Sequence, residues 1–210
     1  RAGGAGGMDD DRLGWYAHHL AGVHDASREQ VVPRDQGELV EALPGLARAL
    51  AAAVKDGRNL RARADMMMSS MMGAIAFQKD LGAVHSCAHA LSTVLDMHHG
   101  LANGIMIDHV MHFNLPAATA KMAELAHVAG APGGDTGTPE ARAKAFIAWL
   151  TALKASLGIP ARLSDNCAPR TVQKSDIPRL VEIAVNDICH QTNPRKCTAA
   201  DFEKLFAAAL

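Results

Sequence analysis

The spacing of apolar residues along this chain follows the helical repeat, and this restricts the fold to an array of α-helices. Between residues 36 and 55, Leu39, Leu43, Leu46, Leu50 and Val54 recur at steps of three and four residues. Positions three and four apart share one face of an α-helix, whereas a half-buried strand alternates apolar and polar residues. The chain shows no ladder of such alternating segments. The sequence therefore predicts an all-α fold.

The same pattern places further helices along the chain. We expect them over residues 60–76, around His85 and His89, and over 103–113, 117–129, 139–157, 177–188 and 199–210, with an irregular stretch at 159–175. Asn59 is suited to cap the helix that follows it, and Pro116 is expected to separate its two neighbouring helices. The methionine run at 66–72 is apolar on nearly all sides, which predicts burial among other helices. We expect about seven to nine helices in a single domain over residues 1–210.

Composition agrees with a helical globular protein and excludes several functional classes. Hydrophobic residues make up 49% of the 210 residues, aromatic residues only 4%, and the formal net charge is −1. Abundant Ala, Leu and Met favour helix over sheet. The balanced charge argues against a nucleic-acid partner. No apolar run reaches the length of a membrane span, and the glycine-rich start lacks the apolar centre of a signal peptide, so neither a membrane nor secretion is expected.

The cysteines indicate a reducing environment. Cys87, Cys167, Cys189 and Cys197 form no Cys-x-x-Cys pair, which gives little support to a zinc finger or a redox pair. Scattered thiols together with ten methionines suit the cytosol, so a cytoplasmic location is expected. The glycines in residues 3–7 follow no predicted strand and precede no lysine, so they do not indicate a phosphate-binding loop.

The stretch from Gly82 to Ile105 carries the strongest chemical signal. His85 and His89 are four residues apart, so on a helix they project from the same face. His99 follows 14 residues after His85, directly before Gly100, where we expect a loop just past a helix end. A helical imidazole and a second one that returns from a loop can hold a metal ion from two directions. His109 and His112 are expected to be packing or surface residues on their helix.

The segment from Gly82 to Asn114 closely resembles the metal-binding stretch of the iron-containing alcohol dehydrogenases. The resemblance resumes at residues 187–195, which end in Asn193-Pro194-Arg195, and it extends from about Asp35 onward. It implies the helical C-terminal half of that family's fold, with residues 1–35 as a divergent N-terminal segment. A nucleotide-binding α/β half precedes this region in the family and is not contained in these residues. We expect a partner or a longer polypeptide to supply it.

The resemblance also implies a role for each residue of the site. His85 and His99 would bind the metal, His89 would lie beside substrate and cofactor as a catalytic residue, and Cys189 would line the substrate pocket. Gly7-Met8-Asp9 matches the start of the family's earlier metal-binding pattern, which makes Asp9 a third ligand. Four residues further on, Leu13 stands where the family has a histidine, so we expect weakened metal binding.

An alcohol dehydrogenase of this kind uses its ion as a Lewis acid while hydride passes to a nicotinamide. Two histidines and one carboxylate suit Fe(II), with Zn(II) as the alternative, and the complete protein would use NAD or NADP. The expected partners are a small alcohol or aldehyde, the nucleotide-binding half and further copies of the chain. Two other hypotheses remain: a non-catalytic remnant or interaction module that keeps the helical fold, and a metal hydrolase, which no specific residue supports.

Overall fold

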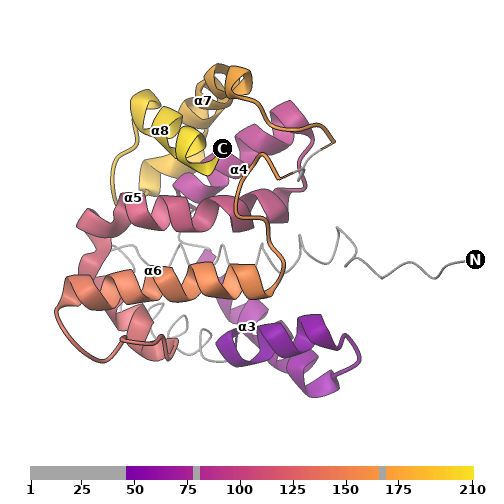
Figure 1. The fold of residues 1–210 in the computed structure, drawn as a ribbon, viewed down its shortest axis with the longest axis vertical. Helices are drawn as coiled ribbons and strands as arrows, with labels where there is room; N and C mark the ends of the chain where they lie inside the picture. The colour runs from indigo at the N-terminus through magenta and orange to yellow at the C-terminus, as the bar shows by residue number, and fades with distance from the viewer. Residues whose placement is uncertain (1–45, 78–80, 166–168) are drawn as a thin grey trace, which may run out of the picture.

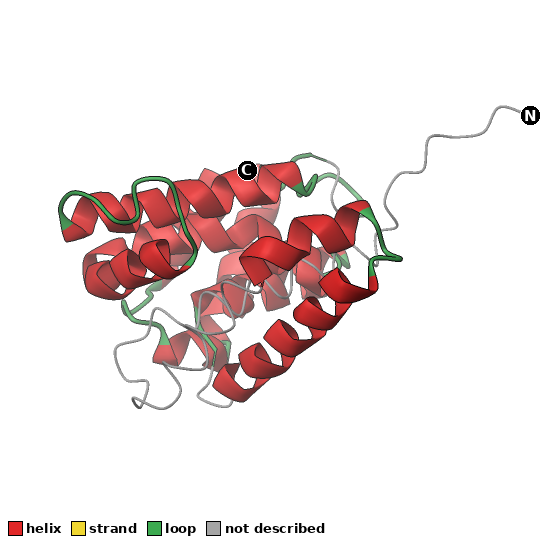
Figure 2. Ribbon diagram, turned by 90° about the horizontal axis from the view of Figure 1, so that it is seen from below, coloured by secondary structure: helices red, strands yellow, loops and turns green. Residues whose placement is uncertain are grey.

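The computed structural model of the chain describes residues 46–77, 81–165 and 169–210, and these residues form an array of α-helices without strands (Figures 1 and 2). After a helical stretch at 46–55, the α-helices are α3 (Leu60–Phe77), α4 (Ala83–Leu95), α5 (His99–Val128), α6 (Pro139–Ser156), α7 (Ile177–Asn186) and α8 (Ala199–Ala209). The all-α prediction is confirmed. Within the described ranges, no helix combines the length and apolarity needed to cross a bilayer.

Helix α4 lies in the interior of the array. Nine of its 13 residues are buried, and it packs against α5, α7 and the 3₁₀ helix η2 (Ile188–Thr192). Burial on nearly all sides explains its content of Ala, Val, Leu and Cys, because each face contacts another element. His85 is 3% exposed on this helix, so its imidazole lies within the packed structure and not on the surface.

Helices α5 and α6 run alongside each other and make the most extensive helix–helix contact of the described residues (Figure 1). On α6, the core contact is formed by residues at helical spacing that are all buried, namely Ala143, Phe146, Ile147 and Leu150. The expected separation at Pro116 is a kink: α5 continues to Val128, with non-helical dihedral angles at Ala118. Because proline lacks an N–H group, it removes one helical hydrogen bond without ending this well-packed helix.

Helix α3 overturns the expectation for the methionine run. Met66 is 1% exposed, but Met67, Met68 and Met71 are 66%, 54% and 53% exposed. A helix that is apolar on every face is buried on every face only if other elements surround it. Helix α3 lies at the edge of the array, so part of its apolar surface is exposed (Figure 1). The cap prediction is confirmed, because Asn59 Oδ1 accepts a hydrogen bond from the Ala62 N–H at 3.0 Å.

The C-terminal elements fold back onto α4 and α5. The short 3₁₀ helix η1 (Lys174–Asp176) leads into α7, and the chain then turns through Asp187 into η2. The predicted helix at 177–188 is therefore two residues shorter and is followed by a separate turn. The last helix, α8, begins at a capping box in which Thr198 and Asp201 bond to each other's backbone N–H groups. Phe202 and Phe206 of α8 are fully buried.

Candidate metal centre

Three imidazole rings come together between the start of α5 and the middle of α4. The ring centroids lie 5.2 Å apart for His89 and His99, 5.5 Å for His85 and His99, and 6.2 Å for His85 and His89. The two α4 histidines project from one helix face, as their four-residue spacing requires. The structure thus brings the three predicted histidines into one cluster, while their chemical roles stay predictions.

The start of α4 is fixed by an asparagine from the C-terminal region. Asn193 Oδ1 accepts a hydrogen bond from the Ala83 N–H at 3.2 Å and another from the Asn114 side chain at 3.1 Å. The Asn193 amide in turn donates to Asn114 Oδ1 at 2.7 Å. Gly82 caps α4 without a side-chain bond, so this buried amide pair supplies the partner that a polar cap residue supplies elsewhere. The pair holds His85, two residues further along, in its place.

His99 is the first residue of α5, not a loop residue as the sequence had suggested. The chain passes between α4 and α5 through Asp96, which has a left-handed conformation with φ of 51°. Within α5, the Asn103 amide lies 3.0 Å from His99 Nε2 and 3.0 Å from the His99 carbonyl oxygen. Asn103 is fully buried, so it orients the His99 ring from the interior of the helix array.

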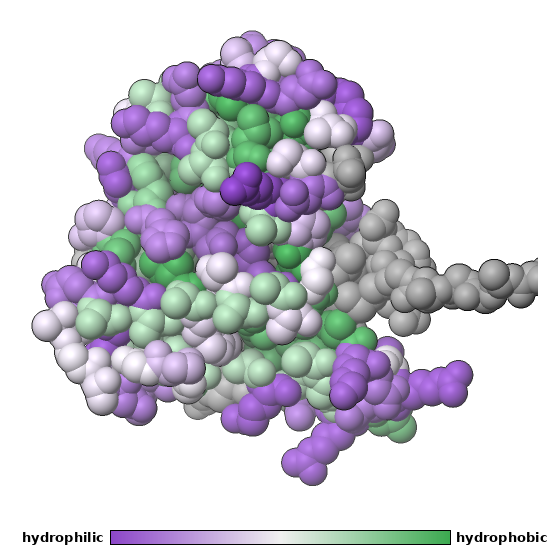
Figure 3. All heavy atoms as spheres, viewed as in Figure 1, coloured by the Kyte–Doolittle hydropathy of each residue, from purple (hydrophilic) through white to green (hydrophobic). Residues whose placement is uncertain are grey.

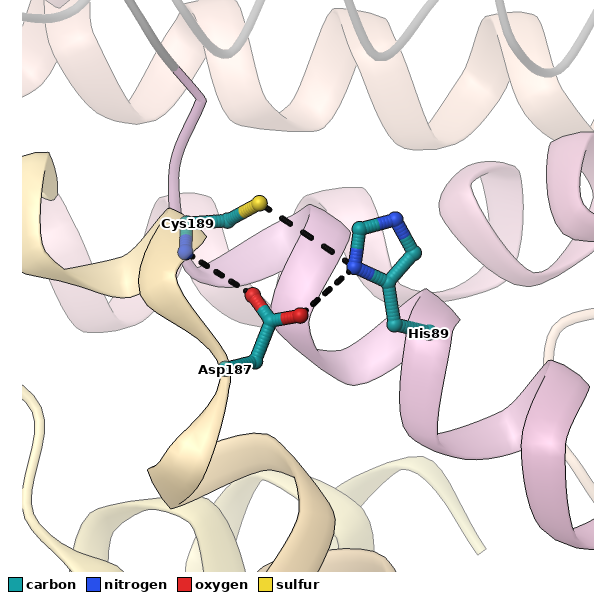
Figure 4. Close-up of side chains that lie close together, drawn as sticks. All are labelled: His89, Asp187 and Cys189. Carbon is teal, nitrogen blue, oxygen red and sulfur yellow. Dashed lines mark hydrogen bonds and ion pairs between the residues drawn. The ribbon is translucent and has the colours of Figure 1, made fainter.

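The Asp187 carboxylate accepts hydrogen bonds from residues of α4 and of η2 (Figure 4). His89 Nδ1 lies 2.8 Å from Asp187 Oδ2, and Ser86 Oγ donates to Asp187 Oδ1 at 2.8 Å. The Cys189 N–H donates to the same Oδ1 at 2.8 Å. Burial alone would raise the pKa of this carboxyl, but these hydrogen bonds outweigh it and lower the pKa to about 2. Asp187 is therefore a carboxylate at neutral pH, and it accepts the hydrogen on His89 Nδ1.

Cys189 lies beside His89, while its predicted place in a substrate pocket stays a prediction. Its Sγ is 4.0 Å from His89 Nδ1, and the residue is partly exposed. Among the described residues, His89, Asp187 and Cys189 are the one group of three potential metal ligands whose donor atoms all lie close to one another. In Figure 4, Nδ1 of His89 faces Asp187 and Cys189, while the other ring nitrogen points away from both. The His89 ring thus contacts Asp187 through Nδ1, while Nε2 faces away from both Asp187 and Cys189.

The chemical types of these side chains suit a transition-metal ion. Clustered imidazoles are ligands for Fe(II) and Zn(II), and a histidine whose second nitrogen is bonded to a carboxylate is a recurrent feature of such sites. The Asp187–His89 bond supplies that feature here. The predicted ligand Asp9, and Leu13 with it, lie outside the described residues.

Asp187 and Ser86 belong to the cluster but were not predicted as site residues from the sequence. A signal for Ser86 was present, because it lies three residues before His89 and so neighbours it on α4. Asp187 opens the stretch 187–195, but it is 98 residues from His89. Only the folding of α7 against α4 brings the two together, and no local pattern predicts that contact.

Comparisons with known proteins point to one family. Residues 37–210 match the profile described as Fe-containing alcohol dehydrogenase family, C-terminal. The 1,3-propanediol dehydrogenase of Klebsiella pneumoniae is 35% identical over 178 residues, which are 84% of this chain and 45% of that protein. Lactaldehyde reductase of Escherichia coli is 33% identical over 171 residues, 81% of this chain and 42% of that protein. A crystal structure of 1,3-propanediol oxidoreductase superimposes with a TM-score of 0.84 at 33% identity, covering 93% of this chain and 50% of that one.

Proposed function

Because the chain belongs to the Fe-containing alcohol dehydrogenase family, we propose that it is the metal-binding part of an NAD(P)-dependent alcohol dehydrogenase. The chain spans about half the length of the curated relatives it matches. The proposed reaction is the interconversion of a small alcohol and its aldehyde in the cytosol. The relatives named above act on small alcohols or aldehydes, which supports this substrate class.

The observation that carries the proposal is the cluster of three imidazoles, whose ring centroids lie 5.2 to 6.2 Å apart. His85 comes from the buried helix α4, His99 from the start of α5, and His89 from the partly exposed edge of the same cluster. We propose that His85 and His99 hold Fe(II), or alternatively Zn(II), and that Asp9 contributes a carboxylate. When bound, the ion would act as a Lewis acid that polarises the alcohol oxygen for hydride transfer from the alcohol to the nicotinamide.

The residues around the histidines have distinct tasks in this proposal. Asp187 keeps the hydrogen of His89 on Nδ1 and fixes the plane of its ring. Asn103 orients the ring of His99. Cys189 borders the same space and would contact the substrate. The rings of His89 and His99 are thus each held by a neighbouring side chain before any ligand arrives, which lowers the cost of assembling the site.

The nicotinamide must be held by residues beyond this helical region, because hydride transfer requires a close and oriented cofactor. We propose that a nucleotide-binding half, with NAD or NADP, forms the other wall of the cleft. Exposed methionines on α3 show that this region presents apolar surface. A second copy of the chain is a further proposed partner for such surface.

A chimera tests the proposed function. The nucleotide-binding half of the Klebsiella pneumoniae 1,3-propanediol dehydrogenase would be fused before residue 1, so that the proposed ligand Asp9 and Leu13 stay in the protein. We expect alcohol-dependent formation of NADH in the presence of Fe(II) or Zn(II), and its loss in the His85→Ala chimera. The His98→Ala chimera is the matched control, because His98 is an exposed neighbour of His99.

The alternative is a non-catalytic remnant that keeps the helical fold. Leu13 favours it, because the residue stands where the family has a metal-binding histidine. A folded chimera that binds metal and NAD but forms no NADH with any of several small alcohols would support the remnant and contradict the enzyme. Formation of NADH that depends on His85 would exclude the non-catalytic remnant.

A further inference from the structure

We propose that His89, Asp187 and Cys189 form a second metal site, which binds Zn(II) on the Nδ1 side of His89. This site is separate from the proposed centre at His85 and His99, and binding there does not rest on the proposed function. An ion at the second site takes the nitrogen that now bonds to Asp187. If the proposed function holds, the same ion inhibits the complete enzyme.

The separations of the donor atoms carry the first step. His89 Nδ1 is 2.8 Å from Asp187 Oδ2 and 4.0 Å from Cys189 Sγ, and donor atoms of the three residues all lie within 4.8 Å of one another. Three atoms with these separations share a point about 2.0 to 2.4 Å from each of them, which matches the bonds of Zn(II) to nitrogen, oxygen and sulfur. Widening the nitrogen–oxygen separation to about 3.4 Å gives the tetrahedral angle. The His89 side chain is 38% exposed, so its ring has room for that movement.

The Asp187 carboxylate is held in place independently of His89. Ser86 Oγ and the Cys189 N–H both donate to Oδ1 at 2.8 Å, which leaves Oδ2 facing the His89 ring. Figure 4 shows the carboxylate and the sulfur on the same side of the ring, toward Nδ1. These two hydrogen bonds persist when an ion replaces the Nδ1 hydrogen, and hydrogen-bonded carboxylates of this kind are typical metal ligands.

The chemical types of the donors select the ion. Zn(II) takes sulfur, nitrogen and oxygen ligands together, whereas Mg²⁺ and Ca²⁺ require oxygen. Asp187 is 17% exposed at its side chain and Cys189 is half-buried, so water reaches the site and completes the coordination. On binding, the His89 hydrogen moves from Nδ1 to Nε2, and the Cys189 thiol releases its proton to solvent. One proton is therefore released for each ion bound.

A titration of the full chain with Co(II), followed by absorbance, tests the second site. A thiolate-to-cobalt charge-transfer band reports an ion bound to a cysteine, and the proposed centre at His85 and His99 contains none. We expect the band in the wild type and in His85→Ala, and its loss in Cys189→Ser. Cys197→Ser is the matched control and should keep the band, because Cys197 is also half-buried but lies outside the group of His89 and its neighbours.

Two further measurements concern the ion and the support of Asp187. Zn(II) should displace Co(II) and remove the band, and calorimetry in buffers of different protonation enthalpy should give about one proton released per ion at this site. Ser86→Ala loosens the carboxylate and should weaken binding about 10-fold or more. Circular dichroism on each variant shows whether the helices are retained.

The outcomes separate the second site from the proposed metal centre. No band in the folded wild-type chain, or a band that persists in Cys189→Ser, would overturn the second site whatever His85 and His99 bind. A band that requires Cys189 supports it. If such a band is accompanied by only one Co(II) per chain, in the wild type and in His85→Ala alike, the second site stands and the proposed centre is contradicted.

Discussion

At the scale of single residues, Asp187 determines which nitrogen of His89 carries the hydrogen. In Asp187→Asn, the amide oxygen can still accept from Ser86 and from the Cys189 N–H, which places the amide nitrogen opposite His89 Nδ1. Two donors then face each other, so we expect the His89 hydrogen to move to Nε2. Nitrogen NMR shifts of the His89 ring report this tautomer directly.

The same substitution should lower the free energy of unfolding by about 1–3 kcal/mol, because a charge-assisted hydrogen bond is lost in a partly buried place. Glu203→Gln, at an exposed position on α8, is the control and should change neither quantity. An Asp187→Asn protein with the wild-type tautomer at His89 would show that Asp187 does not fix the ring.

Residue identities allowed the histidine cluster to be predicted but not its supports. His85 and His89 share a helix face by their spacing alone, and His99 was placed with them by a resemblance over a single continuous stretch. Asp187, Asn193 and Asn114 act through hydrogen bonds that span 79 to 110 residues of sequence. A buried polar pair of this kind leaves no local pattern, because each partner looks like an ordinary turn or helix residue until the fold joins them.

At the scale of elements, a buried ion pair joins α5 to α6. Lys154 is 2% exposed, and its Nζ donates to Asp108 Oδ1 at 2.6 Å and to the Ile105 carbonyl oxygen at 2.9 Å. Burial lowers the pKa of Lys154, and Asp108 opposes this effect. We expect Lys154→Met to cost about 3 kcal/mol of unfolding free energy, because Asp108 is left without its cation.

The double variant Lys154→Met, Asp108→Leu should recover most of that loss, since it removes both charges from the interface. Urea unfolding of the two single variants and the double variant measures the coupling. Additive losses in the double variant would mean that the pair does not stabilise the α5–α6 contact.

His109 adds a pH dependence to the same interface. Burial is the main cause that lowers its pKa below 6.5; Lys154 and His112 also lower it, while Asp108 and a bond with the Ala161 backbone oppose this. The unfolded chain therefore takes up the His109 proton at a higher pH than the folded one, so stability falls as the pH drops below 6.5. Between about pH 7.5 and 5.5, the wild type should lose more unfolding free energy than His109→Phe does. An equal loss in both proteins would assign the acid sensitivity to other groups.

The helices themselves were largely predictable, and the exceptions have physical causes. Periodicity located α3, α6 and α8, because each buries a stripe or ends at a recognisable cap. It failed for the exposed methionines of α3, since composition shows that a helix is apolar but not which of its faces has a neighbour. Lys154 lies within the α6 sequence as an ordinary charged residue, and its burial follows only from the position of Asp108 on α5.

At the scale of the whole molecule, we propose that the described helices form one side of a cleft whose other side is the nucleotide-binding half. Across the face seen in Figure 3, weakly apolar residues run in a band over α6, between more hydrophilic groups above and below. The exposed methionines of α3 add apolar surface elsewhere. We expect the chain alone to self-associate at micromolar concentration and to reduce no NAD or NADP with alcohol, because no residue of the described helices provides a nucleotide-binding turn.

Light scattering and an absorbance assay for NADH check these two expectations. A nucleotide-binding half added to the chain should restore turnover. A clean monomer that turns over alcohol by itself, with the activity abolished in His85→Ala, would show that the helical part binds its cofactor unaided.

The central claim is that the histidines from α4 and α5 hold one metal ion. Crystals of the chain grown with Zn(II), with diffraction recorded on both sides of the zinc absorption edge, test it most directly. The account predicts a single anomalous peak at about 2.1 Å from one ring nitrogen each of His85 and His99. Ordered rings at these two residues with no peak between them, in crystals that contain Zn(II) elsewhere, would contradict it.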